Sequence, residues 1–404
     1  ESASLNPLST GQDRNDGIEA QAGRVRHAPF LRGGRHGVPR AGRAAMSGAL
    51  SPDPAPIDPA LAAALAPLAA LSARLGADRN LIQGAGGNTS LKRGERELWV
   101  KASGTWLAAA ERQPIFVGLD LAEVRRRLAA DEAEPALPAR LDPAGALRPS
   151  IETTLHALLP HAVVVHVHSV NTIAYAVRAD GPARVAERLD GLRWAWIPYA
   201  KPGLPLTRAV QAEMHRAPDV LVLGNHGLVI GAPDTEAAAA LLAEVESRLA
   251  VPARSVPAPD LPALDRLAAL SAGRYRPARL GEAHAAATDP AHATIAGRGA
   301  LYPDHVVFLG PSPVPVLAVQ QAEPWLKAAH AGGDMPALLL VEGVGALLRA
   351  DLGAGAEEMA ACLGLVLPRL DPDAPLVFLG PDQEAELLDW DAEKYRQSLN
   401  TAEQ

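Results

Sequence analysis

Two histidines separated by one residue are the strongest candidates for chemistry in this sequence. His166 and His168 lie at the end of the apolar run 162–165, which is typical of a buried strand. Because side chains of a strand alternate between its two faces, both imidazoles point to the same side and can bind one ion together. The alternative is that one of them is a buried core histidine.

A third histidine lies at a turn between two further apolar runs. His226 belongs to the sequence GNHG, between residues 221–223 and 228–230. Three neutral imidazoles leave one coordination position open, which is how catalytic zinc sites are built. We therefore expect a divalent metal, zinc, to be bound by His166, His168 and His226. A plain turn residue is the other interpretation of His226.

Glu152 is the candidate acid/base. Ser150 precedes it and is expected to cap a helix over 151–159, with Glu152 in the first turn. The short helix–strand connection to His166 can bring that turn near the metal. The alternative is a surface acid that the helix dipole favours. His156, one turn further on, is interpreted as structural.

A glycine-rich segment precedes these residues. Residues 84–90, GAGGNTS, are expected to form a loop whose backbone N–H groups and small side chains can hold an anion. The segment lacks the Gly-Lys-Ser/Thr of a Walker A loop. It also precedes a strand over 98–101 instead of opening a helix, which excludes the dinucleotide-binding fingerprint.

Helices and strands are expected to alternate around these candidates. Asp58 followed by Pro59 predicts the start of a helix that ends near residue 75. The other expected helices cover 207–215 and 235–249, and the other strands cover 163–167, 221–223 and 228–230. Such interleaving indicates an α/β layer fold.

Composition divides the chain into four segments. We expect a disordered, arginine-rich leader over 1–45, a catalytic domain over 46–250, a proline-rich linker over 251–262 and a smaller α/β domain over 263–404. The start of the true chain is expected near Met46.

The last segment contains a candidate internal repeat. Residues 336–363 align without gaps on 218–245, and Val344 then stands where the first copy has His226. We interpret the second copy as a degenerate repeat without the metal site. Chance similarity of two strand–turn–strand–helix units is the alternative.

Composition also limits the partners. The chain of 404 residues is 48% hydrophobic and can bury the cores of two domains. Its net charge of -8 argues against nucleic acid or an anionic membrane as the partner. The longest apolar stretch, Leu61–Ala73, contains Pro67 and is shorter than the ~20 residues that cross a bilayer. Cys362 is the only cysteine, which excludes an intramolecular disulfide. We expect a cytoplasmic protein.

Five motifs together resemble the class II aldolase/adducin family. GGNTS, KASG, PSIETTLH, HVHS and GNHGLVI occur in the family's order and approximate spacing over residues 61–249. The resemblance implies an α/β/α layered fold with a central, mainly antiparallel sheet. It also implies zinc on His166, His168 and His226, and Glu152 as the acid/base. The residues that resemble the family's substrate-phosphate site are Gly87, Asn88, Ser103, Gly104 and Ser150.

Two longer stretches narrow the resemblance. PSIETTLHALLP and YPDHVVFLGP resemble the aldolase half of bifunctional proteins that join a rhamnulose-1-phosphate aldolase to a short-chain dehydrogenase. This implies a metal-dependent aldolase that cleaves or forms a C–C bond in a sugar or sugar phosphate through a metal-stabilised enediolate. Ile151 stands where sugar-phosphate aldolases of the family often have a second serine, which weakens the case for a phosphate.

Other functions remain open at this point. Epimerases and decarboxylases of the same family share the metal site, and an adducin-like structural protein keeps the fold without catalysis. A cupin-type oxygenase also uses the H-x-H pattern, but the helices around the pair argue against an all-β barrel. Family members form homo-oligomers, and a tetramer or a dimer is expected here.

Overall fold

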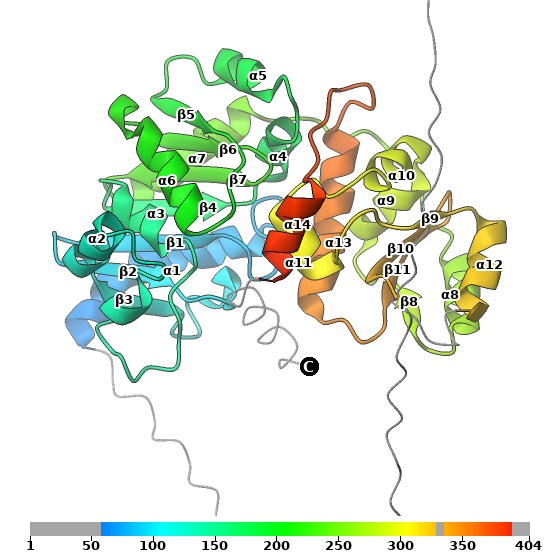
Figure 1. Cartoon of the computed structure of the whole chain (residues 1–404), viewed down its shortest axis with the longest axis horizontal. Coiled ribbons are helices and arrows are strands. Elements are labelled where there is room, and N and C mark those ends of the chain that lie inside the picture. Colours follow the sequence, from blue (N-terminus) through cyan, green and yellow to red (C-terminus); the bar gives the residue numbers. More distant parts are fainter. Residues whose placement is uncertain (1–57, 329–334, 390–404) are drawn as a thin grey trace, which may run out of the picture. The chain divides into compact units, whose positions relative to one another are not determined.

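A seven-stranded sheet forms the centre of the first half of the computed structural model, which describes residues 58–328 and 335–389 (Figure 1). The strand order is β3-β2-β1-β4-β7-β6-β5. All neighbours are antiparallel except β5 and β6, so the expected mainly antiparallel sheet is confirmed. The strands are β1 (Asn88–Arg93), β2 (Glu97–Lys101), β3 (Phe116–Asp120), β4 (Val163–Val167), β5 (Trp194–Ile197), β6 (Val220–Leu223) and β7 (Gly227–Ala232). The predicted leader over 1–45 lies outside the described residues.

Helices cover both faces of this sheet, as an α/β/α layered fold requires (Figure 1). Val163, Val165 and Val167 pack on one face and Val164 on the other, because side chains alternate along β4. The first face is covered by α1 (Pro59–Ala77), α4 (Val170–Ala176), α5 (Gly181–Arg188) and α7 (Thr235–Arg248). The second is covered by α2 (Leu121–Ala129), α3 (Thr153–Leu158) and α6 (Leu204–Glu213).

The first helix begins as its sequence predicts. The Asp58 carboxylate accepts a hydrogen bond from the backbone N–H of Ala60 at 3.0 Å, and Pro59 occupies the first helical turn. Among the described residues, α1 is long and apolar enough to cross a membrane by length and composition alone. In this structure its buried leucines pack in the core over the sheet; they are Leu65, Leu68, Leu71 and Leu75.

Two local predictions near the site are wrong in detail. The glycine loop ends at Gly87, because residues 88–90 already belong to β1 and pair with β4; Ser90 also pairs with β2. The helix expected over 151–159 is α3, which begins at Thr153. Ser150 therefore does not cap it; its hydroxyl instead accepts a weak hydrogen bond from the N–H of Glu152, at 3.3 Å.

A second, four-stranded sheet follows in the order β8-β11-β10-β9 (Figure 1). Its strands are β8 (Tyr275–Pro277), β9 (Val316–Leu317), β10 (Leu338–Val341) and β11 (Gly345–Arg349). The helices here are α8 (Leu261–Leu270), α9 (Ala285–Thr288), α10 (Pro290–Ala296), α11 (Pro303–Leu309), α12 (Val319–Ala328), α13 (Ala354–Val366) and α14 (Pro381–Leu388). Short 3₁₀ helices are η1 (Leu107–Ala109), η2 (Leu137–Ala139), η3 (Met214–Arg216), η4 (Gly281–His284) and η6 (Leu367–Arg369).

The second sheet repeats the arrangement of four strands in the first. In the order β8-β11-β10-β9 as in β4-β7-β6-β5, the first two pairs are antiparallel and the last pair is parallel. The register is also the same, because Val220 pairs with Ile230 and Leu338 pairs with Leu348, as the alignment of the two segments requires. The strands thus match the predicted repeat, while a common origin and the domain boundaries stay predictions.

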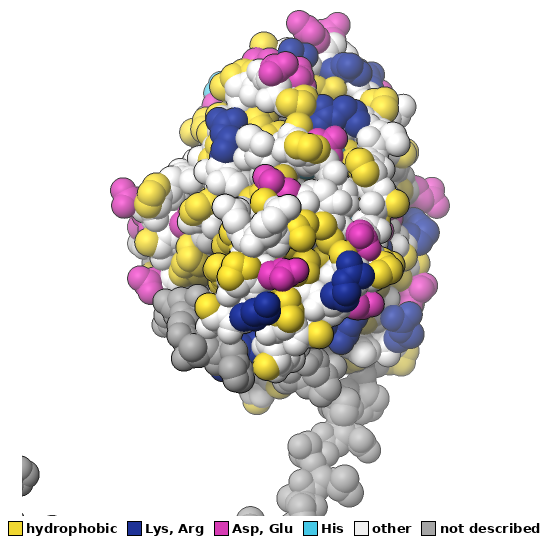
Figure 2. Space-filling view, turned by 90° about the vertical axis from the view of Figure 1, so that its right-hand side faces the viewer, with side chains coloured by type: hydrophobic (Ala, Val, Ile, Leu, Met, Phe, Trp, Pro, Cys, Tyr) yellow, Lys and Arg dark blue, Asp and Glu magenta, His cyan; other side chains and the backbone are white. Residues whose placement is uncertain are grey.

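The two halves of the chain, which contain the seven-stranded and the four-stranded sheet respectively, share a continuous core. The described residues, 58–328 and 335–389, belong to one compact unit. One apolar cluster joins Val170 and Ile173 of α4 to Met359 and Leu363 of α13. The predicted linker over 251–262 has no helix or strand up to Leu261, where α8 begins. On the face seen in Figure 2, basic, acidic and apolar side chains of the described residues are interspersed, so no single sign of charge dominates that face.

Candidate metal centre

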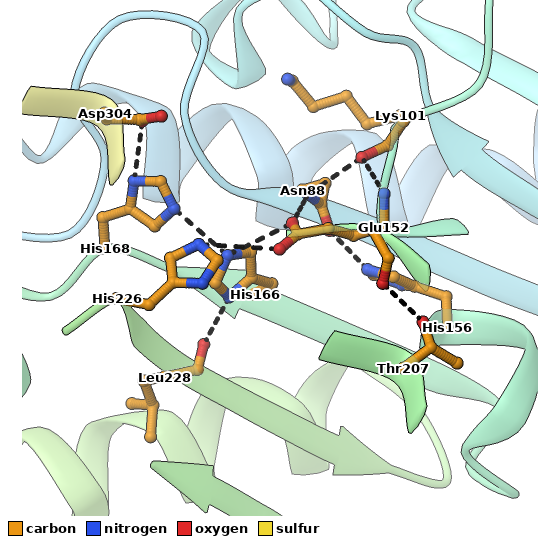
Figure 3. A network of polar contacts seen from close by, with 12 residues as sticks. Asn88, Lys101, Glu152, His156, His166, His168, Thr207, His226, Leu228 and Asp304 are labelled. Carbon is orange, nitrogen blue, oxygen red and sulfur yellow. Dashed lines mark hydrogen bonds and ion pairs between the residues drawn. The ribbon is translucent and has the colours of Figure 1, made fainter. Parts of the chain in front are cut away.

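Strand pairing brings the three predicted histidines together. His166 lies in β4 opposite Val229 of β7, and His168 follows the end of β4. His226 lies in the tight turn between β6 and β7, at the same end of the sheet. All three side chains are buried, and one ring nitrogen of each lies within 4.8 Å of the others (Figure 3). The expected cluster of imidazoles is therefore present.

The hydrogen bonds of two rings determine which nitrogens face the centre. Nδ1 of His166 donates to the backbone carbonyl of Leu228 at 3.0 Å, and Nδ1 of His168 lies 3.2 Å from a carboxylate oxygen of Asp304. With a proton on each Nδ1, both Nε2 atoms carry lone pairs, yet they lie 3.2 Å apart. Two lone pairs at this distance repel each other unless a cation lies between them. The donor set therefore fits a divalent metal.

Burial keeps the imidazoles of His166 and His226 in the neutral form that binds metals. Burial lowers the pKa of His226 to about 3, although the Glu152 carboxylate raises it in part. It also lowers the pKa of His166, again against the effect of Glu152. Neutral imidazoles are the ligands that zinc prefers, and no proton has to be displaced from them at pH 7.

Glu152 lies beside the histidine cluster and is buried. Its Oε2 is 3.4 Å from Nε2 of His166, and its Oε1 is 3.6 Å from Nε2 of His226 (Figure 3). Burial raises its pKa, but His166, His226 and a hydrogen bond from Asn88 lower it more, and the resulting pKa is about 2. Within the described part of the chain, Oε1 has no hydrogen-bond partner, so it is available to a substrate or a metal.

Asn88 holds the other oxygen of Glu152. Its side-chain NH₂ donates to Oε2 of Glu152 at 2.8 Å and to the hydroxyl of Ser150 at 3.2 Å. Its carbonyl oxygen accepts a hydrogen bond from Nε2 of His156, whose Nδ1 accepts one from the Ser90 hydroxyl at 2.7 Å. His156, interpreted as structural from the sequence, thus fixes the orientation of the amide that holds Glu152.

A cavity beside the histidines contains every other predicted site residue. Its lining includes Gly87, Asn88, Ser103, Gly104 and Ser150, which come from the β1 entrance, the turn after β2 and the segment before α3. It also includes Lys101, whose ammonium group donates to the carbonyl of Ala85 at 2.9 Å. Lys101 was not predicted as a site residue. It belongs to the KASG motif, two residues before Ser103, and this place in the motif is the signal that could have indicated it.

A second residue was missed by sequence reasoning. Asp304 in α11 lines the same cavity and contacts His168. It belongs to the stretch YPDHVVFLGP, which resembles a family sequence, but no local spacing relates it to the histidines. Pro202 also lines this cavity, and Arg148 lines an adjoining one that shares Ser103 and Ser150 with it.

Residues 66–251 match the model of the Class II Aldolase and Adducin N-terminal domain. This match supports the class II aldolase/adducin family for the segment that contains the candidate metal centre. A curated relative, "Uncharacterized oxidoreductase YuxG" of Bacillus subtilis (strain 168), is 34% identical over 170 residues, which are 38% of this chain and 24% of the relative. The chain thus matches only about a quarter of that protein's length.

Solved structures similar to this chain include aldolase domains. The N-terminal class II aldolase domain of a conserved protein from Thermoplasma acidophilum is 26% identical; the match covers 45% of this chain and 89% of that chain, with a TM-score of 0.40. L-fuculose-1-phosphate aldolase from Thermus thermophilus is 17% identical, with 46% and 91% covered and a TM-score of 0.32.

Proposed function

We propose that this protein is a divalent-metal-dependent aldolase that acts on a small sugar or sugar phosphate. The observation that carries the proposal is the convergence of three buried histidine nitrogens beside the buried carboxylate of Glu152. The match of residues 66–251 to the class II aldolase/adducin family supports it.

The histidines would hold the metal, and zinc fits three neutral imidazoles. A divalent cation bound there supplies positive charge beside a substrate carbonyl oxygen, where negative charge develops as an enediolate forms. The backbone carbonyl of Leu228 orients the ring of His166 by accepting the Nδ1 proton.

Glu152 would move the proton. In the cleavage direction a base takes the hydroxyl proton on one side of the C–C bond, and the electron pair of that bond passes to the carbon beside the carbonyl. Returning a proton to that carbon completes the reaction and restores the base. Oε1 is the oxygen suited to this role, because Asn88 occupies Oε2.

The neighbouring cavity would hold the rest of the substrate. Lys101, Ser103 and Ser150 bring an ammonium group and two hydroxyl groups to its lining, beside the glycines Gly87 and Gly104. An ammonium group and hydroxyl donors favour an anionic substituent such as a phosphate or carboxylate. This supports a sugar phosphate, even though Ile151 replaces one of the family's usual serines.

Metal analysis of untagged protein and product analysis test the proposal together. The wild type is expected to bind one zinc or similar ion per chain and to cleave a ketose 1-phosphate into two fragments. His168→Ala is expected to lose the metal. Glu152→Gln is expected to keep it and to lose at least about 100-fold in kcat.

Each alternative predicts a different outcome. An inverted stereocentre in the product identifies an epimerase, and released carbon dioxide identifies a decarboxylase. A wild-type protein that binds no metal after reconstitution contradicts the aldolase and favours an adducin-like structural protein.

Three finer features belong to the same proposal. The name of the Bacillus relative, an oxidoreductase, is compatible with our proposal that this chain is the aldolase half of a bifunctional aldolase–dehydrogenase. We also propose that the protein is cytoplasmic and forms a homo-oligomer, a tetramer or dimer. Light scattering tests the oligomeric state directly.

A further inference from the structure

A carboxylate from the second half of the chain enters the candidate metal centre. Asp304 lies in the first turn of α11 and is 5% exposed. Its Oδ2 is 3.2 Å from Nδ1 of His168, the ring nitrogen that faces away from the other two histidines (Figure 3). This contact joins the two halves of the chain at a predicted metal ligand.

The contact determines which nitrogen of His168 is free to bind. A histidine that binds a metal through Nε2 needs its proton on Nδ1 and an acceptor for that proton. His166 has such an acceptor in the carbonyl of Leu228, supplied by the neighbouring strand β7. His168 lies beyond the end of β4, and Asp304 supplies the corresponding acceptor.

The surrounding structure fixes both partners of this contact. The backbone carbonyl of His168 accepts a hydrogen bond from the side-chain amide of Gln83 at 3.2 Å. The segment before α11 is held by Asn225, whose amide donates to the carbonyl of Leu301 at 3.0 Å. Because Asn225 immediately precedes His226, the same turn that carries one histidine also places the helix that orients another.

The described part of the second half has no metal ligands at the positions that correspond to His166 and His226. Pro277 is paired with Leu347 as His166 is paired with Val229, and Val344 aligns with His226. Neither Pro277 nor Val344 can bind a metal. The second half nevertheless contributes Asp304 to the site of the first.

We propose that Asp304 is a positioning residue that holds His168 with Nε2 directed at a divalent metal, so that the second half of the chain completes the metal centre of the first. The proposal rests on the proposed function, because it takes the three histidines as metal ligands. It assigns to α11 a role that the matched segment 66–251 does not include.

The test compares the affinity of metal-free protein for Zn²⁺, measured by competition with a chromophoric chelator. The variants are Asp304→Asn, which preserves the shape, and Asp304→Ala, which removes the acceptor. Both are expected to bind Zn²⁺ about 10–100-fold more weakly than the wild type. The visible spectrum of the Co²⁺-loaded protein is expected to change in both, because the orientation of one ligand changes.

Glu358→Gln is the matched control. Glu358 in α13 also joins the two halves, through two hydrogen bonds from the guanidinium group of Arg79 at 2.8 and 3.1 Å. It makes no contact with a histidine of the site among the contacts of the described residues. This variant is expected to lose some thermal stability and to keep wild-type Zn²⁺ affinity and the Co²⁺ spectrum.

The outcomes separate this inference from the proposed function. Wild-type affinity in both Asp304 variants, or an equal loss in Glu358→Gln, overturns the positioning role and leaves the metal-dependent function intact. A wild-type protein that binds neither Zn²⁺ nor Co²⁺ overturns the proposed function itself. Circular dichroism of each variant shows whether it is folded, and the Asn variant decides the test if the Ala variant is not.

Discussion

The Glu152 carboxylate is oriented by a chain of three buried polar side chains. Glu152 accepts from the Asn88 amide, and Asn88 accepts from His156, which in turn accepts from the Ser90 hydroxyl. Burial lowers the pKa of His156 to about 3, so its ring is neutral and carries a single N–H. That N–H is directed at Asn88, which forces the amide NH₂ toward Glu152.

His156→Phe is therefore expected to impair catalysis without removing the metal. Without the donor at Nε2, the Asn88 amide can rotate and no longer holds Glu152 in one orientation. We expect kcat to fall about 10-fold or more, as for other residues that orient catalytic groups, with unchanged zinc content. Steady-state kinetics and elemental analysis measure both.

Ser72→Ala is the control for this prediction. The Ser72 hydroxyl also forms a buried hydrogen bond to β1, to the hydroxyl of Thr89 at 2.7 Å, but it does not reach Glu152. The Ser72→Ala substitution should lower the free energy of unfolding by about 1 kcal/mol and leave kcat unchanged. Equal kinetic effects in the two variants would mean that His156 acts only through packing.

The lowered pKa of the buried Lys92 predicts a measurable pH dependence of the free energy of unfolding. Its ammonium group is buried and donates to the carbonyl of His161 at 2.7 Å. Burial, together with Arg125, lowers its pKa from 10.5 to about 7. Between these values the unfolded chain holds a proton that the folded chain has released. The free energy of unfolding therefore rises with pH in this range. Below pH 7 Lys92 is charged in the folded chain too, and the cost of burying that charge then destabilises the fold in full.

The measurement is the difference in the free energy of unfolding between wild type and Lys92→Met at pH 7 and at pH 9. Subtracting the variant removes the contributions of the other titrating groups. We expect the wild type to gain about 2 kcal/mol relative to Lys92→Met over this range. A difference that does not depend on pH contradicts the lowered pKa.

At the scale of single elements, the turn into β1 depends on a glycine. Gly87 has φ of +60°, and a Cβ atom there would collide with the side chain of Ile82 and lie 2.7 Å from the carbonyl oxygen of His166. Gly94, in the turn after β1, has a similar φ of +62° but open space around it. Substitutions at these two positions therefore distinguish the cost of a positive φ from the cost of a Cβ atom that collides with its neighbours.

Gly87→Ala is expected to cost at least about 3 kcal/mol of stability, whereas Gly94→Ala should cost about 1 kcal/mol. Both variants bear the cost of a positive φ. Only the first must also displace the backbone of β4 or the side chain of Ile82. Denaturant unfolding of both variants measures the difference, and similar losses would show that the contact with β4 relaxes easily.

The elements also show what the sequence could predict. The apolar run before His166 predicts β4 with the bounds that the structure has, because four consecutive valine-rich positions suit a strand buried on both faces. In contrast, the polar sequence NTSLKR of β1 contains no such signal. It forms a strand because β2 and β4 pair with it on either side, and this tertiary effect overrides local preference.

At the scale of the whole molecule, contacts between distant segments explain what the sequence could not predict. The three histidines could be predicted because strand alternation and a turn between two apolar runs are local patterns. Asp304 was not found, because its contact with His168 depends on how the second half packs against the first. The ion pairs of Arg79 could not be predicted for the same reason. Arg79, in the segment after α1, binds Glu282 of η4 and Glu358 of α13, which are far from it in the sequence.

The turn that carries His226 is also a junction between the halves. Asn225 adopts φ of +51°, and its side-chain amide donates to the carbonyls of Leu301 at 3.0 Å and Val377 at 2.8 Å. Its backbone N–H donates to the carbonyl of Ala176 at 2.9 Å. One residue therefore connects α4, the segment before α11 and the segment before α14 to the histidine that follows it.

Asn225→Gly is expected to weaken both folding and metal binding. Glycine tolerates the positive φ, so the variant removes only the amide and its two hydrogen bonds, at a cost of about 1–3 kcal/mol. Because His226 and α11 both lose their connection, we expect Zn²⁺ affinity to fall as well. Asn171→Ala is the control: its side chain also bridges the halves, by accepting hydrogen bonds from the backbone N–H of Val251 and the guanidinium group of Arg369. Its side-chain amide donates to Glu246 and to no histidine of the site. This variant should lower stability alone, and an equal loss of Zn²⁺ affinity in both variants would refute a specific link between Asn225 and the metal centre.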